Sequence, residues 1–375
     1  MSIVAATLHL RLVRALAVAV LLVLPAAFSA AQVSPATESA TRVDVIEAKR
    51  AGKPQLDIAL VLPLEAPAYA LAADAVRSGF LAAADAAGAR AQCVVIGHGE
   101  GGVTAAFATA RSAAKVVVGP LVRDDLKVIA GANLELPWTI ALNHLEDGAP
   151  LSPQIYTFAL TVDSDARLLA RRMRDTGAEN IVVITGETPF LQRFAGAFAT
   201  EWLLAGGGAP NAFRFDASPP ALASFKREIS KQRGKQRLDG ALLALNGANA
   251  ALLKPYLGSV ASFASALTFD RPSDSEMRDL DGLVVAELPW LVTRDAAEFA
   301  QLPRREFGSA ALERLYALGL DAFRVAQAFR AGPPTRFSHD GATGEITLVE
   351  GRQFAREGRL AVFREGQLAP LPNGR

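Results

Sequence analysis

Short apolar segments alternate with longer ones over the first part of the chain. We predict that the short segments are strands, and they read LDIALVLP (56–63), AQCVVIG (91–97), KVVVGP (115–120) and PWTIALN (137–143). Residues 68–87, 102–114 and 124–134 lie between them and carry apolar residues at helical spacing, so we predict helices there. Continuous apolar strands joined by helices are typical of a parallel sheet covered on both faces.

The same alternation begins again at Asp163, which we take as the cap of a helix over 163–176. Further helices are predicted at 190–205, 219–232 and 248–258. The predicted strands are NIVVIT (180–185), AFRF (212–215), DGALLALN (239–246), SALTF (265–269) and DGLVVAEL (281–288). The fold class is therefore α/β, with two flavodoxin-like, doubly wound lobes.

The last part of the chain has a different pattern. A strongly amphipathic helix over 310–330 is followed by Pro333-Pro334 and then by GEITLV (344–349) and RLAVFR (359–364). Two strands with no helix between them indicate a hairpin. We expect the chain to cross between the lobes near Leu160, Pro289 and Pro334. Lobe 1 would then comprise 56–160 plus 290–333, and lobe 2 would comprise 161–289 plus 334–375.

The first 31 residues have the features of an export signal. Arg11 and Arg14 precede an apolar run over 15–28, and small residues precede a cleavage site before Gln32. An uncleaved membrane anchor is the alternative, but the run is short and contains Pro25. Residues 32–55 are predicted to be a linker. No cysteine for lipid attachment follows the signal, so we expect a periplasmic chain without a stable membrane span.

Charge and cysteine content exclude several classes of protein. The net charge is +1, and loss of the two arginines of the signal would change it to −1. Such a balance gives no field to attract nucleic acid or an anionic membrane. The single cysteine, Cys93, cannot form an intrachain disulfide and lies in a predicted strand. We interpret it as a packing residue.

One glycine-rich motif could indicate that the protein binds a dinucleotide cofactor. Gly97-x-Gly99-x-x-Gly102 has the spacing of a dinucleotide-binding turn. It follows the second strand rather than the first, Glu100 would oppose a pyrophosphate, and the next strand ends in Gly119-Pro120 without an acid for the ribose. A glycine-rich βα turn is the better interpretation. No nucleophile elbow, phosphate loop or paired histidines are present, so we expect no cofactor, no metal and no enzyme.

Several segments resemble type 1 periplasmic binding proteins. LPLEAPAYALAADAVRSGFLAA resembles their first βα unit, KVVVGPL with LPWTIALN resembles the following pair of strands, and DGATGEITLVEGR resembles their lobe-crossing hairpin. This resemblance implies the same two-lobed fold with a three-crossing hinge.

Within that superfamily the chain is similar to the penicillin-binding protein activator family, also called LppC/LpoA. The resemblance rests on Gly119-Pro120-Leu121 with Ala141-Leu142-Asn143, on Glu287-Leu288-Pro289-Trp290, and on RLYALGLDA at 314–322. It covers about residues 56–370. Members familiar from enteric bacteria look like outer-membrane lipoproteins with a helical repeat domain before this part, so the resemblance is to the C-terminal module alone.

A ligand of this fold is expected beyond the carboxyl ends of the strands. The cleft candidates that share this placement are Glu65, Tyr69, Gly119, Leu121, Asn143, His144, Thr188, Asn246, Asp270, Glu287 and Trp290. For Trp290 a place in the core is the simpler interpretation, and for Asn143 a capping role.

Two functions remain, from different classes. The resemblance implies a regulator that binds a class A penicillin-binding protein and stimulates peptidoglycan synthesis. The alternative is the solute receptor of an importer of branched-chain amino acids or similar small molecules, with its ligand in the cleft between the lobes. The receptors' Ser/Thr-rich loop would fall at 143–146, where no hydroxyl is present. We therefore favour the regulator.

Overall fold

The computed structural model describes residues 56–371 apart from 133, 146–148, 236 and 270–277. These residues all belong to one compact unit. The predicted export signal, its cleavage site and the linker over 32–55 lie outside the described residues, as does the cleft candidate Asp270.

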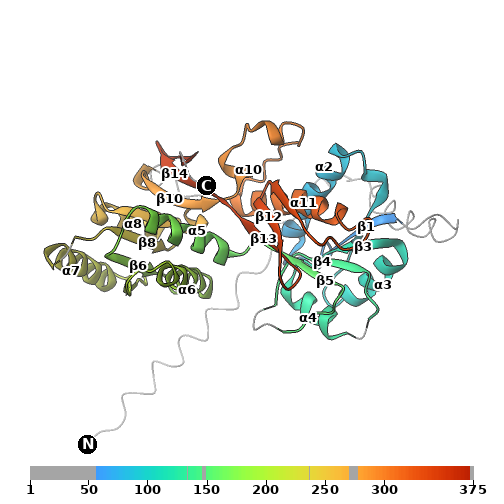
Figure 1. The fold of residues 1–375 in the computed structure, drawn as a ribbon, viewed down its shortest axis with the longest axis horizontal. Helices are drawn as coiled ribbons and strands as arrows, with labels where there is room; N and C mark the ends of the chain where they lie inside the picture. Colours follow the sequence, from blue (N-terminus) through green and yellow to red (C-terminus); the bar gives the residue numbers. More distant parts are fainter. Residues whose placement is uncertain (1–55, 133, 146–148, 236, 270–277, 372–375) are drawn as a thin grey trace, which may run out of the picture. The chain divides into compact units, whose positions relative to one another are not determined.

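The first sheet contains eight strands (Figure 1). They are β1 (Leu56–Leu62), β2 (Cys93–Gly97), β3 (Ala114–Val118), β4 (Trp138–Ala141), β5 (Ile155–Phe158), β11 (Ser338–Gly341), β12 (Gly344–Val349) and β13 (Gln353–Glu357). Their order is β11-β12-β13-β5-β4-β3-β1-β2, and β1 to β5 are parallel. The order β2-β1-β3-β4-β5 is that of flavodoxin-like sheets.

The second sheet repeats this order with seven strands. They are β6 (Ile181–Thr185), β7 (Asn211–Arg214), β8 (Gly240–Ala244), β9 (Ala261–Ala264), β10 (Leu283–Glu287), β14 (Arg359–Arg364) and β15 (Gln367–Pro370). Strands β7-β6-β8-β9-β10 are parallel and again have the flavodoxin-like order. The predicted fold class, two doubly wound α/β lobes, is confirmed.

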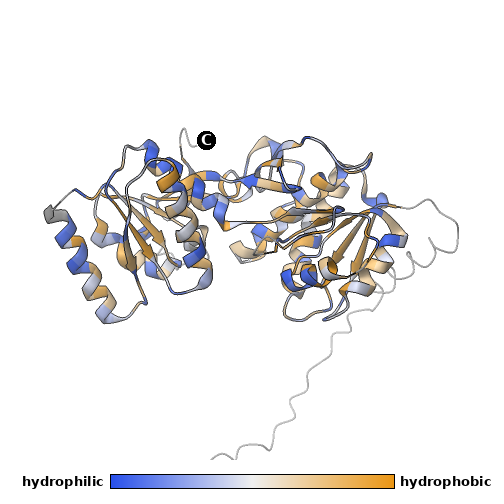
Figure 2. Ribbon diagram, turned by 60° about the horizontal axis from the view of Figure 1, so that its bottom comes forward, coloured by the Kyte–Doolittle hydropathy of each residue, from blue (hydrophilic) through white to orange (hydrophobic). Residues whose placement is uncertain are grey.

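Helices cover the faces of both sheets. In the first lobe they are α2 (Ala70–Ala86), α3 (Val103–Ala113), α4 (Arg123–Gly131) and α11 (Ala310–Gln327); in the second they are α5 (Val162–Asp175), α6 (Pro189–Leu204), α7 (Pro219–Lys235) and α8 (Gly247–Leu257). The short helix α10 (Pro289–Val292) follows β10. The central strands are hydrophobic and lie between helices that also carry hydrophilic residues (Figure 2). Central strands such as β1, β3 and β8 are buried by helices on both sides, whereas the edge strand β7 is mostly exposed.

Helices α2 and α11 pack closely because glycine residues face each other at their crossing. A Cβ atom on Gly79 would collide with the carbonyl of Tyr316, and one on Gly319 would collide with the carbonyl of Val76. Phe80 and Phe323 form an edge-to-face pair beside this crossing, with ring centroids 5.4 Å apart. Helix α11 thereby belongs to the core of the first lobe.

The structure corrects the predicted hairpin and the third crossing. Strand β12 pairs with β11 and β13, and β13 pairs with β5, so these three strands extend the first sheet. Strand β14 pairs with β10 and β15 in the second sheet. The chain therefore crosses at Gly358 rather than near Pro334, and 338–357 do not belong to the second lobe. Burial explains the division, because Ile346 and Phe354 enter the first core whereas Phe363 enters the second.

One predicted strand is also wrong. Residues 266–269 of SALTF form a 3-10 helix, and the strand beside it is β9, which precedes this segment in the chain. The apolar run was too short for periodicity to distinguish these two states.

Cys93 is buried at the start of β2, and its Sγ atom lies 3.6 Å from the carbonyl oxygen of Ala89. Burial raises the pKa of the Cys93 thiol to about 11. At pH 8 only roughly one folded molecule in a thousand would carry the reactive thiolate. We expect a disulfide reagent to label Cys93 slowly in the folded protein and within seconds to minutes in denaturant. Equal labelling rates in the two states would contradict this assignment.

Candidate functional site

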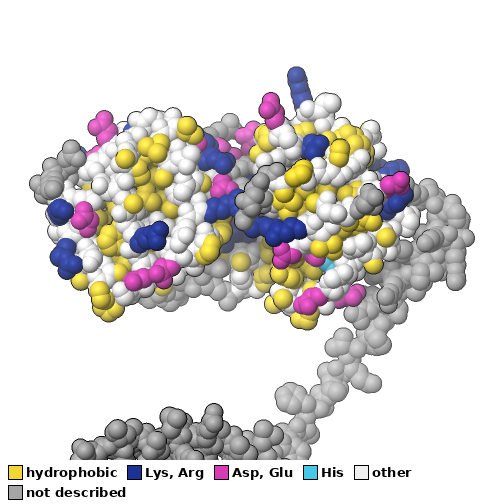
Figure 3. Space-filling view, turned by 90° about the horizontal axis from the view of Figure 1, so that it is seen from below, with side chains coloured by type: hydrophobic (Ala, Val, Ile, Leu, Met, Phe, Trp, Pro, Cys, Tyr) yellow, Lys and Arg dark blue, Asp and Glu magenta, His cyan; other side chains and the backbone are white. Residues whose placement is uncertain are grey.

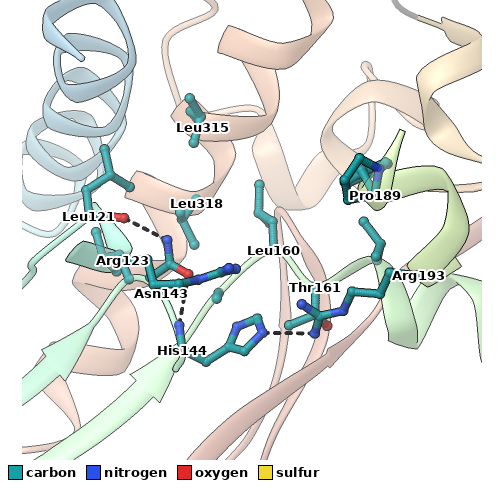
Figure 4. Close-up of a pocket in the computed structure, with 14 residues that line it drawn as sticks. Leu121, Arg123, Asn143, His144, Leu160, Thr161, Pro189, Arg193, Leu315 and Leu318 are labelled. Carbon is teal, nitrogen blue, oxygen red and sulfur yellow. Dashed lines mark hydrogen bonds between the residues drawn. The ribbon is translucent and has the colours of Figure 1, made fainter. Parts of the chain in front are cut away.

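A pocket of about 440 Å³ lies beyond the carboxyl ends of β3, β4 and β5 (Figure 4). Its volume is within the usual range of small-molecule sites. Fourteen residues line it: Leu121, Arg123, Leu142, Asn143, His144, Ala159, Leu160, Thr161, Val162, Pro189, Phe190, Arg193, Leu315 and Leu318. They come from the segments that follow three strands of the first sheet, from the starts of α4, α5 and α6, and from α11.

The polar side chains of the pocket are joined to one another. The amide of Asn143 donates to the carbonyl of Leu121 at 3.0 Å and accepts from the backbone N–H of His144 at 3.0 Å. Arg193 Nη2 lies 3.0 Å from His144 Nε2. Because a guanidinium group only donates hydrogen bonds, His144 accepts this bond as a neutral imidazole. The dashed lines in Figure 4 mark these contacts.

Arg193 also binds an acid next to the pocket. Its Nε and Nη2 atoms lie 3.0 Å and 2.6 Å from the two carboxylate oxygens of Asp163. Asp163, predicted to cap a helix, is instead the second residue of α5 and pairs with α6, while Thr161 occupies the capping position. The contacts through Arg193 therefore connect the loop after β4 with the first turn of α5 and the second turn of α6.

Three of the eleven cleft candidates line this pocket, namely Leu121, Asn143 and His144. Two others lie next to lining residues. Gly119 is buried in the turn before Leu121, in a cis peptide bond with Pro120 and with a φ of +116°. Thr188 caps α6 immediately before Pro189, and its side-chain oxygen accepts from the N–H of Leu191.

The remaining described candidates do not line the pocket. Glu65 and Tyr69 are exposed after β1, and Asn246 caps α8 by accepting from the N–H of Asn249 at 2.9 Å. Trp290 is buried between Phe299 and Tyr316, with the guanidinium of Arg304 3.5 Å from the centre of its ring. Trp290 is thus a core residue, as the simpler interpretation held.

Glu287 is completely buried and takes part in an ion pair. Arg314 on α11 donates to both of its carboxylate oxygens, at distances of 2.6 to 3.1 Å, and also to the carbonyl of Ala266. The backbone N–H of Leu288 donates to Glu287 as well. This pair joins the end of β10 to α11 at the second crossing, and Glu287 does not line the pocket.

Other buried ionic groups surround the first and third crossings. Asp165 on α5 and Arg356 on β13 are paired at 2.6 Å, and burial raises the pKa of the Asp165 carboxyl while Arg356 opposes that shift. A Cβ atom on Gly358 would lie 2.9 Å from the carbonyl oxygen of Glu287 and 3.2 Å from Asp165 Oδ1. The three crossings therefore meet around Gly358.

Asp321 of α11 anchors the turn between β11 and β12. Its carboxylate accepts from the backbone N–H groups of Ala342 and Thr343, at 3.0 and 2.6 Å, and from the Thr343 hydroxyl at 2.7 Å. Arg324 Nη1 lies 3.2 Å from the same carboxylate. Asp321 is completely buried, so these bonds hold the last strands of the first sheet against α11.

Sequence reasoning missed Arg123, Thr161, Pro189 and Arg193 as pocket residues. Arg123, Thr161 and Pro189 each lie in the first turn of a helix or at its cap, where a polar or proline residue is ordinary and gives no signal of a site. Arg193 is the fifth residue of α6. Within 56–371, excluding the gaps in the description, no helix is long and apolar enough to span a membrane. The described residues likewise contain no cluster of three or more His, Cys, Asp or Glu side chains suited to a metal.

The fold is that of a type 1 periplasmic binding protein. A solved structure of a putative branched-chain amino acid ABC transporter from Chromobacterium violaceum matches with a TM-score of 0.70 and 30% identity, over 82% of this chain and all of that chain. The C-domain of LpoA from Haemophilus influenzae, described as a regulator of PBP1A, matches with a TM-score of 0.70 and 22% identity, over 84% of this chain and 99% of that one.

The sequence identifies the family. The model of the LppC putative lipoprotein family matches residues 51–366, and the chain belongs to that family. The penicillin-binding protein activator LpoA of Escherichia coli K12 is 24% identical over 300 residues, which cover 69% of this chain and 44% of the relative. The LpoA of Enterobacter sp. strain 638 is 24% identical over 69% of this chain and 42% of that protein. The matched part of this chain thus spans less than half of these relatives.

Proposed function

We propose that the protein is a non-catalytic regulator in the periplasm, which binds a class A penicillin-binding protein and stimulates its synthesis of peptidoglycan. The observation that carries this proposal is the family match over residues 51–366, together with relatives that are named as activators of penicillin-binding proteins. The export signal predicted over residues 1–31 supports the compartment.

The structure adds a role for the residues on which the family resemblance rests. Glu287 and Arg314 form a buried ion pair at the second crossing, and Asp321 anchors the turn after β11. Glu287, Arg314 and Asp321 do not line the pocket. Other residues on which the resemblance rests do line it, namely Leu121, Leu142, Asn143, Leu315 and Leu318. A function shared through the first three would depend on the shape of the two lobes, as binding to a protein partner does.

A solute receptor is the second candidate, because the relative from Chromobacterium violaceum is described as a putative amino acid transporter. An amino acid needs an acid for its ammonium group, and among the described lining residues no carboxylate is present. We therefore expect that leucine, isoleucine and valine at millimolar concentration will not raise the melting temperature, because only binding to the folded state stabilises it. A clear shift would favour the receptor.

The proposed partnership is tested by co-purification. The chain without residues 1–31 is mixed with a purified, detergent-solubilised class A synthase from the same organism, and the retained complex is quantified. We expect retention that saturates as the synthase concentration rises, and none with an unrelated detergent-solubilised membrane protein. If the chain retained no synthase and an amino acid raised its melting temperature, the solute receptor would become the favoured function.

A further inference from the structure

Strand β7 is a free edge of the second sheet. Among the described strands it pairs only with β6, and three of its four residues are exposed. Just after it, the N–H of Phe215 donates to the carbonyl of Thr185 in β6 at 2.9 Å. The N–H and C=O of one residue point to the same side of a strand, and neighbouring residues alternate. The backbone groups of Ala212 and Arg214 therefore point away from β6, and no described residue bonds to them.

A groove of about 570 Å³ lies beside this edge, between β7 and helix α7. It is lined by Val182 of β6, by Asn211, Ala212 and Phe213 of β7, and by five residues of α7. The helix covers the sheet through Phe225, whose ring lies edge-on to that of Phe213 with centroids 5.5 Å apart. The groove thus combines apolar side chains with unpaired backbone groups, and an added strand uses both.

Basic side chains outweigh acidic ones at this edge. Arg227 of the groove donates to the hydroxyl of Ser224 at 2.9 Å and forms no ion pair with a described residue. Arg214 on β7 is exposed and likewise forms none within the described part of the chain. The acid of the groove, Glu228, lies 3.9 Å from the Nζ atom of Lys231, so these two charges offset each other. Two guanidinium groups are left to attract an acidic ligand.

The same charges argue against a second copy of this chain at the edge. Two β7 strands that paired with each other would bring Arg214 and Arg227 of both copies together, and like charges opposite each other destabilise a pair of strands. The surface of the second lobe, at left in Figure 3, carries both signs of charge. The preference for an acid is therefore local to the edge of β7.

We propose that β7 and the groove beside it bind an extended acidic segment of a partner protein as an added strand. The outward backbone groups of Ala212 and Arg214 bond to the main chain of the segment, as in other cases of strand addition to a sheet edge. Carboxylates of the segment meet Arg227 on the α7 face and the Arg214 side chain on the other, while an apolar side chain contacts Phe213. The inference does not rest on the proposed regulatory function.

The test compares two fluorescent peptides with blocked ends that differ only in charge, VEEVEEVE and VKKVKKVK. In an extended peptide of this pattern both faces carry valine and charged residues, so either face can enter the groove. Fluorescence anisotropy measures their binding to the chain without residues 1–31 at physiological salt. We expect the acidic peptide to bind at least about tenfold more tightly than the basic one.

Two variants with matched controls locate the site. Ala212→Pro removes an outward N–H, and proline is tolerated at an edge strand where the N–H faces solvent; Ala212→Ser keeps that N–H. Arg227→Gln removes a charge of the groove, whereas Lys226→Gln removes an exposed charge of α7 outside it. We expect Ala212→Pro and Arg227→Gln each to weaken binding of VEEVEEVE at least about threefold, and both controls to leave it within about twofold. Thermal melting verifies that all four variants are folded.

Three results would overturn the inference: no binding of VEEVEEVE, equal binding of VKKVKKVK, or undiminished binding of VEEVEEVE by folded Ala212→Pro or Arg227→Gln. Sedimentation of the chain alone tests the other occupant, since a dimer that Ala212→Pro dissociates would assign the edge to a second copy and also overturn it. These measurements contain no synthase. A chain that binds the acidic peptide but no synthase would refute only the proposed function, and the reverse result would refute only the inference about β7.

Discussion

Replacement of Glu287 by Gln is expected to lower the free energy of unfolding by about 3–5 kcal/mol, the usual cost of breaking a buried ion pair by removing one partner. Glu287 has no exposed surface, and the Arg314 side chain that it binds is only 11% exposed. The substitution keeps the shape of the side chain but leaves the guanidinium group without its counter-charge in a place that water reaches poorly. Urea denaturation measures the loss as a lower midpoint at an unchanged slope.

Glu298→Gln is the matched control. Glu298 also pairs with an arginine, Arg359, but both side chains are about 40% exposed. A pair of this kind contributes about 0–1 kcal/mol. The double variant Glu287→Leu with Arg314→Met should recover part of the loss, because it removes both charges at once. If Glu287→Gln cost no more than Glu298→Gln, the ion pair would not stabilise the second crossing.

The second large effect is expected at Asp321. Asp321→Asn should lower the free energy of unfolding by at least about 3 kcal/mol, because hydrogen bonds to a charged, buried group are each worth about 1.5–3 kcal/mol. Its carboxylate accepts three hydrogen bonds from Ala342 and Thr343. An asparagine amide places a donor where one carboxylate oxygen accepts, and the buried donors of the turn would then lack an acceptor.

The neighbouring Asp340→Asn serves as the comparison, since Asp340 is exposed on β11. Its replacement should change the free energy of unfolding by less than about 0.5 kcal/mol. Amide hydrogen exchange would show the local consequence at Asp321, as faster exchange of the N–H groups of Ala342 and Thr343. Slow exchange at both positions in Asp321→Asn would contradict the assigned role.

Local patterns made most of the elements predictable. The strand expected at 56–63 is found at Leu56–Leu62, and the helix expected at 310–330 is found at Ala310–Gln327. Periodicity and continuous apolar runs report which face of an element is buried, and this information lies within one element. Both flavodoxin-like lobes could therefore be predicted from the alternation of these runs.

The sheet that each late strand joins could not be predicted in this way. Strands β12 and β14 have similar apolar patterns, yet they join different sheets and are separated by the single crossing at Gly358. Strand pairing is decided by contacts far apart in sequence, such as that of Gln353 with Thr157. The hydrophobic pattern of one strand therefore does not indicate which distant strand it pairs with.

The candidate site was predictable only on one side. Strand ends of the first sheet pointed to Leu121, Asn143 and His144, because ligands of doubly wound sheets sit there. Arg193 could not be found from sequence, since an arginine on a helix surface is ordinary. Glu287 is the last residue of a strand and was therefore a cleft candidate. Its partner Arg314 lies 27 residues later in the chain, so the sequence pattern could not show that Glu287 is buried in an ion pair.

The central claim is tested most directly by the activity of the synthase itself. A purified class A penicillin-binding protein from the same organism polymerises lipid-linked precursor in the presence of increasing amounts of the chain without residues 1–31. Heat-denatured chain and a second periplasmic binding protein of similar size serve as controls. The regulatory function predicts that the rate of polymerisation or cross-linking rises with the folded chain and saturates, and that neither control has this effect. Unchanged rates at saturating concentrations of folded chain would contradict it.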